Sequence, residues 1–364
     1  MISQFIIILS ATVAVFSVMG IGASARYVGW LNKEADSGLL KLIIRVLVPC
    51  LIFDKVVGNT AFDDSSNIYL PPLFGFGSMA IGCLVAFVFG KMSGRWVGLD
   101  SKEKLYTFAV CIGIYNYGFI PIVLVNKLFE PETLGVLFLH NVGVEFGIWT
   151  LGVGLITGGL TKGWWKHVLN PPAITIIVSL LVNAFKLQPY LPQVATDIIT
   201  MLSTAAIPMM MLLIGATFFE QISGRKKEDL INKHSLGTAV LAIVLRIAVV
   251  PLLFLGAVML LPASLQLKQV VLIEAAMPAA VFPLILTQHY GGSSLIALRV
   301  VISTTIIGLI TIPLWISAGL WLLDLNDTVI PTQPTNHEEQ VMSDHESAGR
   351  FHLASGLQLS HNNW

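Results

Sequence analysis

Long apolar runs recur from one end of the chain to the other, and they constrain its fold more than any other feature. A helix needs about 20 mostly apolar residues to cross the hydrocarbon core of a bilayer. The runs are continuous and lack the two-residue alternation of a membrane barrel, so helices are the only option. We therefore predict an all-α membrane protein with ten transmembrane helices, at residues 4–25, 38–57, 69–90, 104–126, 133–159, 168–186, 193–219, 236–261, 269–289 and 295–323.

The composition agrees with a membrane protein and excludes several other classes. Hydrophobic residues make up 55% of the 364 residues and charged residues only 12%, against roughly 25% charged in average soluble domains. The net charge is zero, whereas a nucleic-acid-binding protein needs a clustered basic face. The sequence contains no nucleotide-binding G-x-x-x-x-G-K-S/T motif, no H-E-x-x-H motif and no nucleophile paired with a base. We therefore expect no enzyme, no nucleic-acid or nucleotide partner, and no resident metal or cofactor.

Lys and Arg residues are unevenly divided between the predicted loops. The loops after spans 1, 3, 5 and 7 hold 13 of them, and the loops on the opposite side hold four. Because basic loops stay in the cytoplasm, we expect both termini outside it, in a multi-pass protein of the plasma (inner) membrane. An alternative for the first span is a signal peptide cleaved at Ala23-Ser24-Ala25, but no basic residue precedes its apolar run.

The composition changes abruptly after Asp324. The segment 324–364 is rich in Asn, Ser, Gln and acidic residues, and it holds four of the eight histidines, His337, His345, His352 and His361. These histidines lack a metal-ligand spacing, so a metal-binding tail is the weaker alternative. We predict a polar, disordered tail.

The two halves of the predicted bundle resemble each other. Pro49 in span 2 and Pro208 in span 7 lie at matching places in the two halves. Because five spans per repeat is an odd number, the second half enters the membrane in the opposite orientation. We predict a 5+5 inverted-topology repeat, whose halves 1–159 and 168–323 are joined by a short cytoplasmic linker, 160–167.

Spans 4 and 9 also match, since Asn116-Tyr-Gly-Phe-Ile-Pro121 has its counterpart in Pro278-Ala-Ala-Val-Phe-Pro283. Proline removes a backbone donor and clashes with the preceding turn, so we predict interrupted helices in spans 2 and 7 and in spans 4 and 9. Freed carbonyls and half-helix termini at the membrane centre would then hold a cation or a substrate carboxylate. The alternative is that proline is simply commoner in membrane helices than in soluble ones.

Five ionisable side chains lie at membrane depth, where charge is costly and each one is a functional-site hypothesis. They are Arg45, Glu145, Arg246, Glu274 and Arg299. Glu274 precedes Pro278 by four residues, which is about one helical turn. There its carboxylate would bind a coupling ion, sodium or a proton. The alternative is a structural ion pair with Arg246 or Arg299.

Two asparagines and a second glutamate lie close to the predicted break in span 4. Asn141 in span 5 lies one turn before Glu145 and therefore on the same helix face. Asn116 and Asn141 would both donate amide hydrogens to a substrate carboxylate. The alternatives are hydrogen bonds between helices for the asparagines and an ion pair with a core arginine for Glu145. His140 and His289 lie near span ends, where we expect them at the membrane interface.

Several short motifs follow one another in a distinctive order along residues 1–323. They are Pro49-x-Leu51-x-Phe53, Asn116-x-Gly118-x-x-Pro121, Asn170-Pro171-Pro172, Pro208 with Gly215-Ala216, Met277-Pro278 followed by Tyr290-Gly291, and Ser303-Thr304-Thr305. In this order and spacing the chain resembles the auxin efflux carrier family, which includes plant PIN carriers and bacterial malonate and malate permeases. The linker at 160–167 is much shorter than the cytoplasmic loop of the long plant PIN carriers, so the resemblance does not imply auxin as the substrate.

The resemblance implies a fold and a mechanism. The family is similar in fold to bile acid/sodium symporters and to the NhaA antiporter, with ten helices as a 5+5 inverted repeat and broken helices 4 and 9 that cross beside the substrate site. Spans 1, 2, 6 and 7 would form a scaffold, often dimeric, and spans 3–5 and 8–10 a core that moves like an elevator. On this pattern Glu274 takes the place of a sodium-ligating glutamate of the bile acid symporters.

The residues and the resemblance together predict a secondary active transporter of a small organic carboxylate, working as a homodimer in the lipid bilayer by elevator-type alternating access. Glu274 and Glu145 would couple transport to sodium or a proton. Two alternatives stay open, an uncoupled, potential-driven exporter like the plant auxin carriers and a membrane receptor that binds an anion without moving it. The predicted substrate-binding residues are Asn116, Gly118, Pro121, Asn141, Pro278 and Pro283.

Overall fold

The computed structural model describes residues 2–94, 96–223 and 233–330. The chain divides into a compact unit, Met1–Val329, and a second unit, Ile330–Trp364. The four tail histidines and most of the predicted tail lie outside the described residues, as do three of the basic residues in the loop after span 7 and Arg95. The account that follows concerns the compact unit.

The described residues of this unit form helices and no strand, as the long apolar runs predict. The helices are α1 (Ile2–Val28), α2 (Lys33–Leu42), η1 (Ile43–Leu47), α3 (Val48–Val56), η2 (Thr60–Asp63), α4 (Ser66–Ser93), α5 (Lys102–Gly113), α6 (Phe119–Leu128), α7 (Pro131–Gly147), η3 (Ile148–Gly152), α8 (Val153–Thr157), α9 (Trp165–Val168), α10 (Pro171–Ala184), η4 (Gln188–Tyr190), α11 (Gln193–Ser223), α13 (Lys233–Ile243), η5 (Val244–Val249), α14 (Val250–Leu260), α15 (Leu265–Ala276), α16 (Phe282–Tyr290), α17 (Ser294–Leu322) and η6 (Asn326–Thr328).

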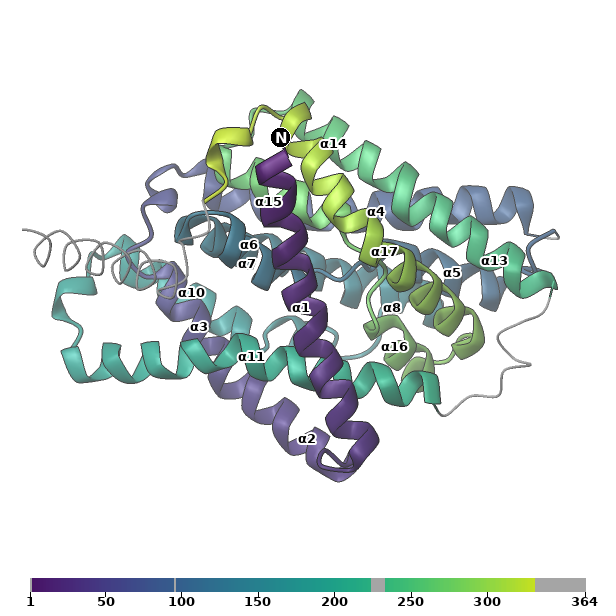
Figure 1. Cartoon of the computed structure of the whole chain (residues 1–364), viewed down its shortest axis with the longest axis horizontal. Helices are drawn as coiled ribbons and strands as arrows, with labels where there is room; N and C mark the ends of the chain where they lie inside the picture. The colour runs from purple at the N-terminus through teal and green to yellow at the C-terminus, as the bar shows by residue number, and fades with distance from the viewer. Residues whose placement is uncertain (1, 95, 224–232, 331–364) are drawn as a thin grey trace, which may run out of the picture. The chain divides into compact units, whose positions relative to one another are not determined.

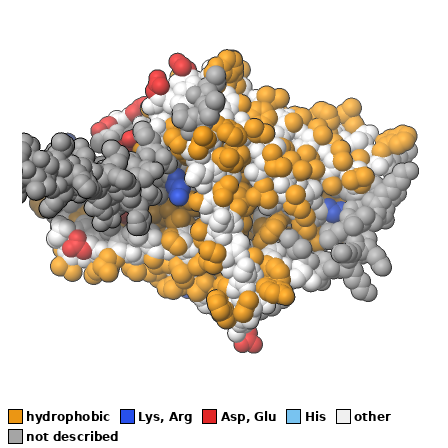
Figure 2. All heavy atoms as spheres, viewed as in Figure 1, with side chains coloured by type: hydrophobic (Ala, Val, Ile, Leu, Met, Phe, Trp, Pro, Cys, Tyr) orange, Lys and Arg blue, Asp and Glu red, His pale blue; other side chains and the backbone are white. Residues whose placement is uncertain are grey.

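Six helical stretches within the described residues are long and apolar enough to cross a membrane. They are Gln4–Val28, Ser66–Ser93, Pro131–Thr157, Gln193–Gln221, Leu236–Leu260 and Ser294–Leu322. Shorter or interrupted helices occupy the other predicted ranges. Hydrophobic side chains cover most of the face seen in Figure 2, with acidic side chains near its edges. An apolar exterior of this extent fits a hydrocarbon surrounding, where lipid replaces water as the solvent of the helices.

Glycines allow the long helices to approach one another closely. A Cβ on Gly22 of α1 would lie 2.1 Å from the backbone oxygen of Leu212, and one on Gly215 of α11 would lie 1.8 Å from that of Met19. The crossing of α1 over α11 is visible in Figure 1. Gly143 of α7 touches α4 in the same way, because its Cβ would lie 1.8 Å from the Pro72 oxygen. Small residues at such crossings are typical of helix packing in membranes.

The predicted breaks in spans 2 and 7 are wrong. Pro208 lies inside the uninterrupted helix α11. Pro49 lies in the first turn of α3, and η1, a π-helical turn, joins α3 to α2 without a gap. The π-helical turn keeps the helix continuous up to the proline, since the Val48 N–H group bonds to the Ile43 oxygen five residues earlier.

Spans 4 and 9 are interrupted. The first stops at Gly113 and resumes at Phe119, and the second stops at Ala276 and resumes at Phe282. Pro121 and Pro283 lie in the first turn of the helices that follow, where a missing N–H group costs no helical hydrogen bond. The non-helical residues 114–118 and 277–281 are joined by an antiparallel bridge between Tyr115 and Ala279. We call these two segments the paired breaks.

Candidate functional site

The paired breaks hold each other by backbone hydrogen bonds. The Asn116 N–H group donates to the Pro278 oxygen at 2.9 Å, and the Ala280 N–H group donates to the Ile114 oxygen at 2.9 Å. The Thr304 hydroxyl of α17 accepts a hydrogen bond of 3.2 Å from the Ala279 N–H group. Two non-helical segments far apart in sequence therefore lie side by side, with helix ends on either side of them.

The predicted substrate-binding residues gather at this place. Asn116 is half-buried in the first break, and its side chain has no hydrogen-bond partner among the described residues. Gly118 is the last residue before α6. Asn141 of α7 donates from its side chain to the backbone oxygen of Tyr117 at 2.9 Å, which brings α7 to the first break. Pro278 belongs to the second break, and Pro121 and Pro283 are buried just beyond the two breaks.

Glu145 is held by two donors. The Tyr117 hydroxyl donates to one carboxylate oxygen at 2.6 Å, and the indole N–H group of Trp149 donates to the other at 2.9 Å. The ion pair with a core arginine, one alternative from the sequence, is not formed within the described part of the chain. Each oxygen of Glu145 thus accepts one hydrogen bond, and the side chain fixes the Tyr117 hydroxyl.

Trp149, which bonds Glu145, also contacts α16, the helix that follows the second break. Its ring stacks on His167 of α9 with centroids 4.2 Å apart. It also meets Phe282 and Tyr290, the two ends of α16, edge-on at 6.0 Å and 6.3 Å. Aromatic contacts of this geometry stabilise beyond the apolar area that they bury. They join the linker between the two halves to the helix that follows the second break.

Glu274 lies in the last turn of α15 and is 0% exposed. Neither of its carboxylate oxygens has a hydrogen-bond partner among the described residues. The predicted alternative of an ion pair with Arg246 or Arg299 is not formed between the described residues, because Arg246 bonds the backbone instead. A buried carboxylate without donors is costly unless a proton or another ligand accompanies it. Among the acidic side chains buried in the described part of the chain, Glu274 is therefore the strongest candidate for a functional role.

His140 is buried, and its predicted place at the membrane interface is wrong. Helix α7 begins at Pro131, so His140 lies well inside it, and its side chain is 1% exposed. The imidazole Nδ1 is 4.0 Å from a Glu274 oxygen and 3.4 Å from the Asn141 side-chain oxygen. The other ring nitrogen is 3.5 Å from the Tyr115 hydroxyl, which bonds Ser78 of α4 at 2.6 Å.

Sequence reasoning did not single out Tyr115, Tyr117 or Ser78. The two tyrosines flank Asn116, and this Tyr-Asn-Tyr pattern in an apolar span was the available signal. Ser78 gave none, because single hydroxyls are common in membrane helices and usually bond their own backbone.

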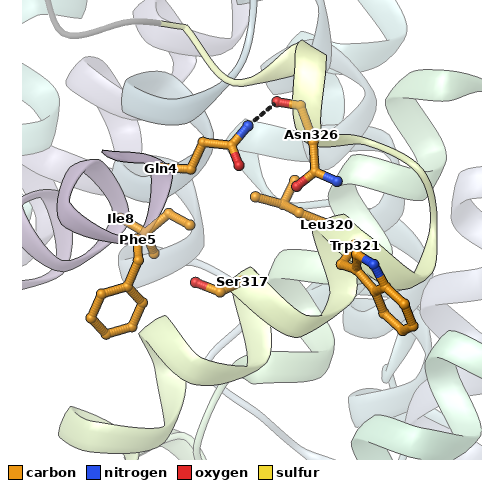
Figure 3. A pocket seen from close by; sticks show the side chains of 7 residues that line it. All are labelled: Gln4, Phe5, Ile8, Ser317, Leu320, Trp321 and Asn326. Carbon is orange, nitrogen blue, oxygen red and sulfur yellow. Dashed lines mark hydrogen bonds between the residues drawn. The ribbon is translucent and has the colours of Figure 1, made fainter. Parts of the chain in front are cut away.

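A separate cavity of about 280 Å³ lies between the start of α1 and the end of α17, and Figure 3 shows the side chains that line it. The Gln4 side chain donates to the Asn326 backbone oxygen at 2.7 Å across it. Its lining is mostly apolar and contains no charged side chain and none of the predicted site residues. The other lining residues are Phe5, Ile8, Ser317, Leu320 and Trp321. The cavity is therefore distinct from the paired breaks.

A helical bundle with apolar walls, two interrupted helices and polar groups buried at the interruptions defines the class of membrane transporters. The chain matches the family described as membrane transport protein over residues 7–162 and 155–316, and it belongs to that family. This agrees with the resemblance to the auxin efflux carriers.

Two archaeal proteins are similar to this chain along nearly their whole length. An uncharacterized transporter of Methanothermobacter thermautotrophicus is 26% identical over 322 residues, which cover 85% of this chain and 98% of that protein. An uncharacterized transporter of Methanocaldococcus jannaschii is 26% identical over 305 residues, covering 81% of this chain and 93% of that protein. Family and relatives are transporters and not enzymes, and the chain is a multi-pass membrane protein.

Proposed function

We propose that this membrane transport protein is a secondary active transporter of a small organic anion and works by elevator-type alternating access. The observation that carries the proposal is the antiparallel pairing of the two breaks, with Asn116 and Asn141 beside them. Interrupted helices at the membrane centre are the usual substrate sites of secondary transporters, because their ends present unpaired backbone groups.

The chemistry around the paired breaks favours a carboxylate. Helices α6 and α16 both begin at the breaks, and the N-terminus of a helix carries partial positive charge. The amide groups of Asn116 and Asn141 add neutral hydrogen-bond donors for an anion. We propose Asn116, Gly118, Asn141 and Pro278 as direct contacts of the substrate, with Pro121 and Pro283 shaping the helix starts.

The proposed architecture is ten spans in a 5+5 inverted repeat whose broken helices cross at the paired breaks. The scaffold would comprise α1, the α2–α3 helix, α10 and α11, and it would also form a homodimer. The contacts of α11 with α1 and α3, and of α10 with α3, support this grouping. The moving core would comprise α4 to α8 and α13 to α17, where α4 packs on α5 and α7, and α15 on α7, α14 and α17.

We propose further that both termini lie outside the cytoplasm and that the protein resides in the plasma (inner) membrane. The excess of Lys and Arg in alternate loops supports this orientation. Coupling would involve a cation, sodium or a proton, at Glu274, since this carboxylate is buried beside the second break with both oxygens unpaired. Glu145 would act through the position of Tyr117.

Charge movement in proteoliposomes tests the proposal. A panel of mono- and dicarboxylates, including indole-3-acetate, is added with sodium, without sodium and at two pH values. A current for one carboxylate that depends on an ion gradient is the expected result. A carboxylate current indifferent to both ions would instead establish an uncoupled, potential-driven carrier. Saturable binding with neither current nor labelled uptake would overturn transport of carboxylates.

A further inference from the structure

The resemblance to bile acid/sodium symporters implies a sodium ion near Glu274, and the residues present can be tested against that ion. In transporters with interrupted helices, sodium is coordinated by the unwound backbone carbonyls and the C-terminal ends of half-helices. Here those groups are the carbonyls at the end of α15, from Glu274 to Met277, together with the Glu274 carboxylate.

A side chain of this chain already binds these carbonyls. The Arg246 guanidinium donates from Nε to the Met277 oxygen at 2.8 Å and from Nη2 to the Glu274 backbone oxygen at 3.0 Å. Arg246 is 0% exposed, so its charge is confined to this place. A positive charge at the C-terminal end of a helix offsets the partial negative charge that accumulates there.

The surroundings of Arg246 hold the guanidinium in this position. It lies over the Tyr115 ring at 4.6 Å and the Phe254 ring at 5.5 Å, which attract a cation by their faces. Arg246 projects from η5, a π-helical turn that precedes Pro251 at the start of α14. Such turns are frequent at functional sites because they redirect one side chain. Three elements, η5, α14 and the first break, therefore fix one charge against the second break.

We infer that Arg246 is a built-in cation that stands where sodium would bind, so that this transporter binds no sodium at the second break. A sodium ion at this place would compete with the guanidinium for the Met277 and Glu274 carbonyls. It would also be repelled by the positive charge of Arg246 at close range. The polar side chains in contact with Arg246 or with the Glu274 carboxylate are Tyr115 and His140, and His140 offers nitrogen rather than the oxygen that a hard cation prefers.

The inference deepens the proposed function. Its consequence for ion coupling rests on that function. Of the two ions proposed for Glu274, the inference excludes sodium. The driving force for transport is then a proton gradient, or the membrane potential without a coupling ion. The implied sodium ion does not fit the residues present, and the fixed guanidinium is the physical reason.

The test uses the purified full-length chain and needs no substrate. The thermal unfolding midpoint is measured in sodium chloride and in choline chloride at equal ionic strength, for the natural chain and for Arg246→Gln, Arg246→Lys and Arg26→Gln. Arg26 is the matched control, because it is also largely buried and bonds Asp36 and Glu220 away from the paired breaks.

For the natural chain we expect the same midpoint in both salts. Arg246→Gln should lower the midpoint in choline and restore part of it with sodium in a saturable manner, because the freed carbonyls then accept the ion. Arg246→Lys keeps the charge and should stay indifferent to sodium and more stable than Arg246→Gln. Arg26→Gln should lower the midpoint equally in both salts.

A saturable, sodium-specific rise in the natural chain would overturn the inference. A folded Arg246→Gln protein without a sodium response would overturn the assignment of Arg246 to the place of the ion. If Arg246→Gln does not fold, Arg246→Lys decides the question. A lysine variant that also fails to fold would show that the site requires more than a positive charge, and it would overturn the inference. None of these results depends on transport, so they are distinct from failure of the carboxylate currents.

Discussion

At the scale of single residues, the polar groups around the paired breaks divide into satisfied and unsatisfied ones. Glu145, which is half-buried, accepts two hydrogen bonds, whereas the fully buried Glu274 accepts none from the described residues. Arg246 donates from two of its nitrogens, and its Nη1 has no partner in the described part of the chain. An unpaired buried group costs about 1–3 kcal/mol and persists only where something else requires it. The Glu274 carboxylate and Arg246 Nη1 are therefore the groups near the paired breaks that we propose a ligand would satisfy.

Asn116 and Asn141 differ in what each would lose on truncation. Asn116→Ala removes an amide without a partner in the described chain, so we expect unchanged stability and a KM for the transported carboxylate raised about tenfold or more, from the loss of about 1.5–3 kcal/mol per charge-assisted hydrogen bond. Asn141→Ala also frees the Tyr117 oxygen and should lower the unfolding midpoint as well. Labelled uptake and thermal unfolding check both variants. An unchanged KM in Asn116→Ala would remove this residue from the site.

Glu274→Gln keeps the shape of the side chain and removes its ability to carry a charge. If Glu274 couples transport to an ion, the variant should transport without responding to an ion gradient, because its side chain no longer exchanges one. Uptake driven by a pH gradient, compared with uptake without one, measures this. Glu145→Gln is the control and should keep the ion response while losing stability, since its carboxylate pairs with Tyr117 and Trp149. An unchanged ion requirement in Glu274→Gln would exclude the coupling role.

At the scale of elements, the ranges of the six long helices could be predicted because bilayer thickness fixes the length of an apolar helix. The effect of each proline could not. Pro49 and Pro208 lie in helices that continue, whereas Pro121 and Pro283 follow real interruptions. In the sequence, a proline that follows an interruption looks the same as a proline in a helix that continues. Packing against the neighbouring elements decides whether the helix is interrupted there. The depth of His140 was missed because the predicted span began two residues after Pro131.

Close packing of α4 on α7 helps to position the first break, because Asn141 and His140 of α7 lie against its residues Tyr117 and Tyr115. Gly143→Ala would place a methyl group 1.8 Å from the Pro72 oxygen, so we expect the two helices to separate and the free energy of unfolding to fall by about 1–3 kcal/mol. Gly20→Ala is the matched control, with nothing within 4 Å of its Cβ, and should raise stability by about 0.5–1 kcal/mol. Thermal unfolding of both variants compares them. Equal stability of the two would contradict the tight crossing.

At the scale of the whole molecule, the residues themselves suggested two related halves, and only the family resemblance implied that spans 4 and 9 cross. The bridge between Tyr115 and Ala279 joins residues from different halves, and no periodicity or composition encodes such a contact. The proposed grouping of helices into a fixed scaffold and a moving core likewise depends on the assembled bundle. It has a mechanical consequence, because elevator motion requires the two groups to slide past each other.

Linking the two groups covalently should therefore stop transport. Gln4 on α1 and Asn326 after α17 belong to opposite groups and are joined by one hydrogen bond. Cysteines at these two positions, in a chain whose partly exposed Cys50 is replaced by serine, would be bridged by a short, cleavable bis-maleimide. We expect uptake to be lost on bridging and regained on cleavage.

The control for this experiment is a bridge within the proposed scaffold. Tyr27 of α1 and Phe219 of α11 have ring centroids 5.9 Å apart, so cysteines at these positions accept the same reagent. Bridging them should leave uptake unchanged, because both helices would stay fixed during transport. Full uptake by the bridged Gln4–Asn326 pair would show that α1 and α17 move together, which no division into these two groups permits.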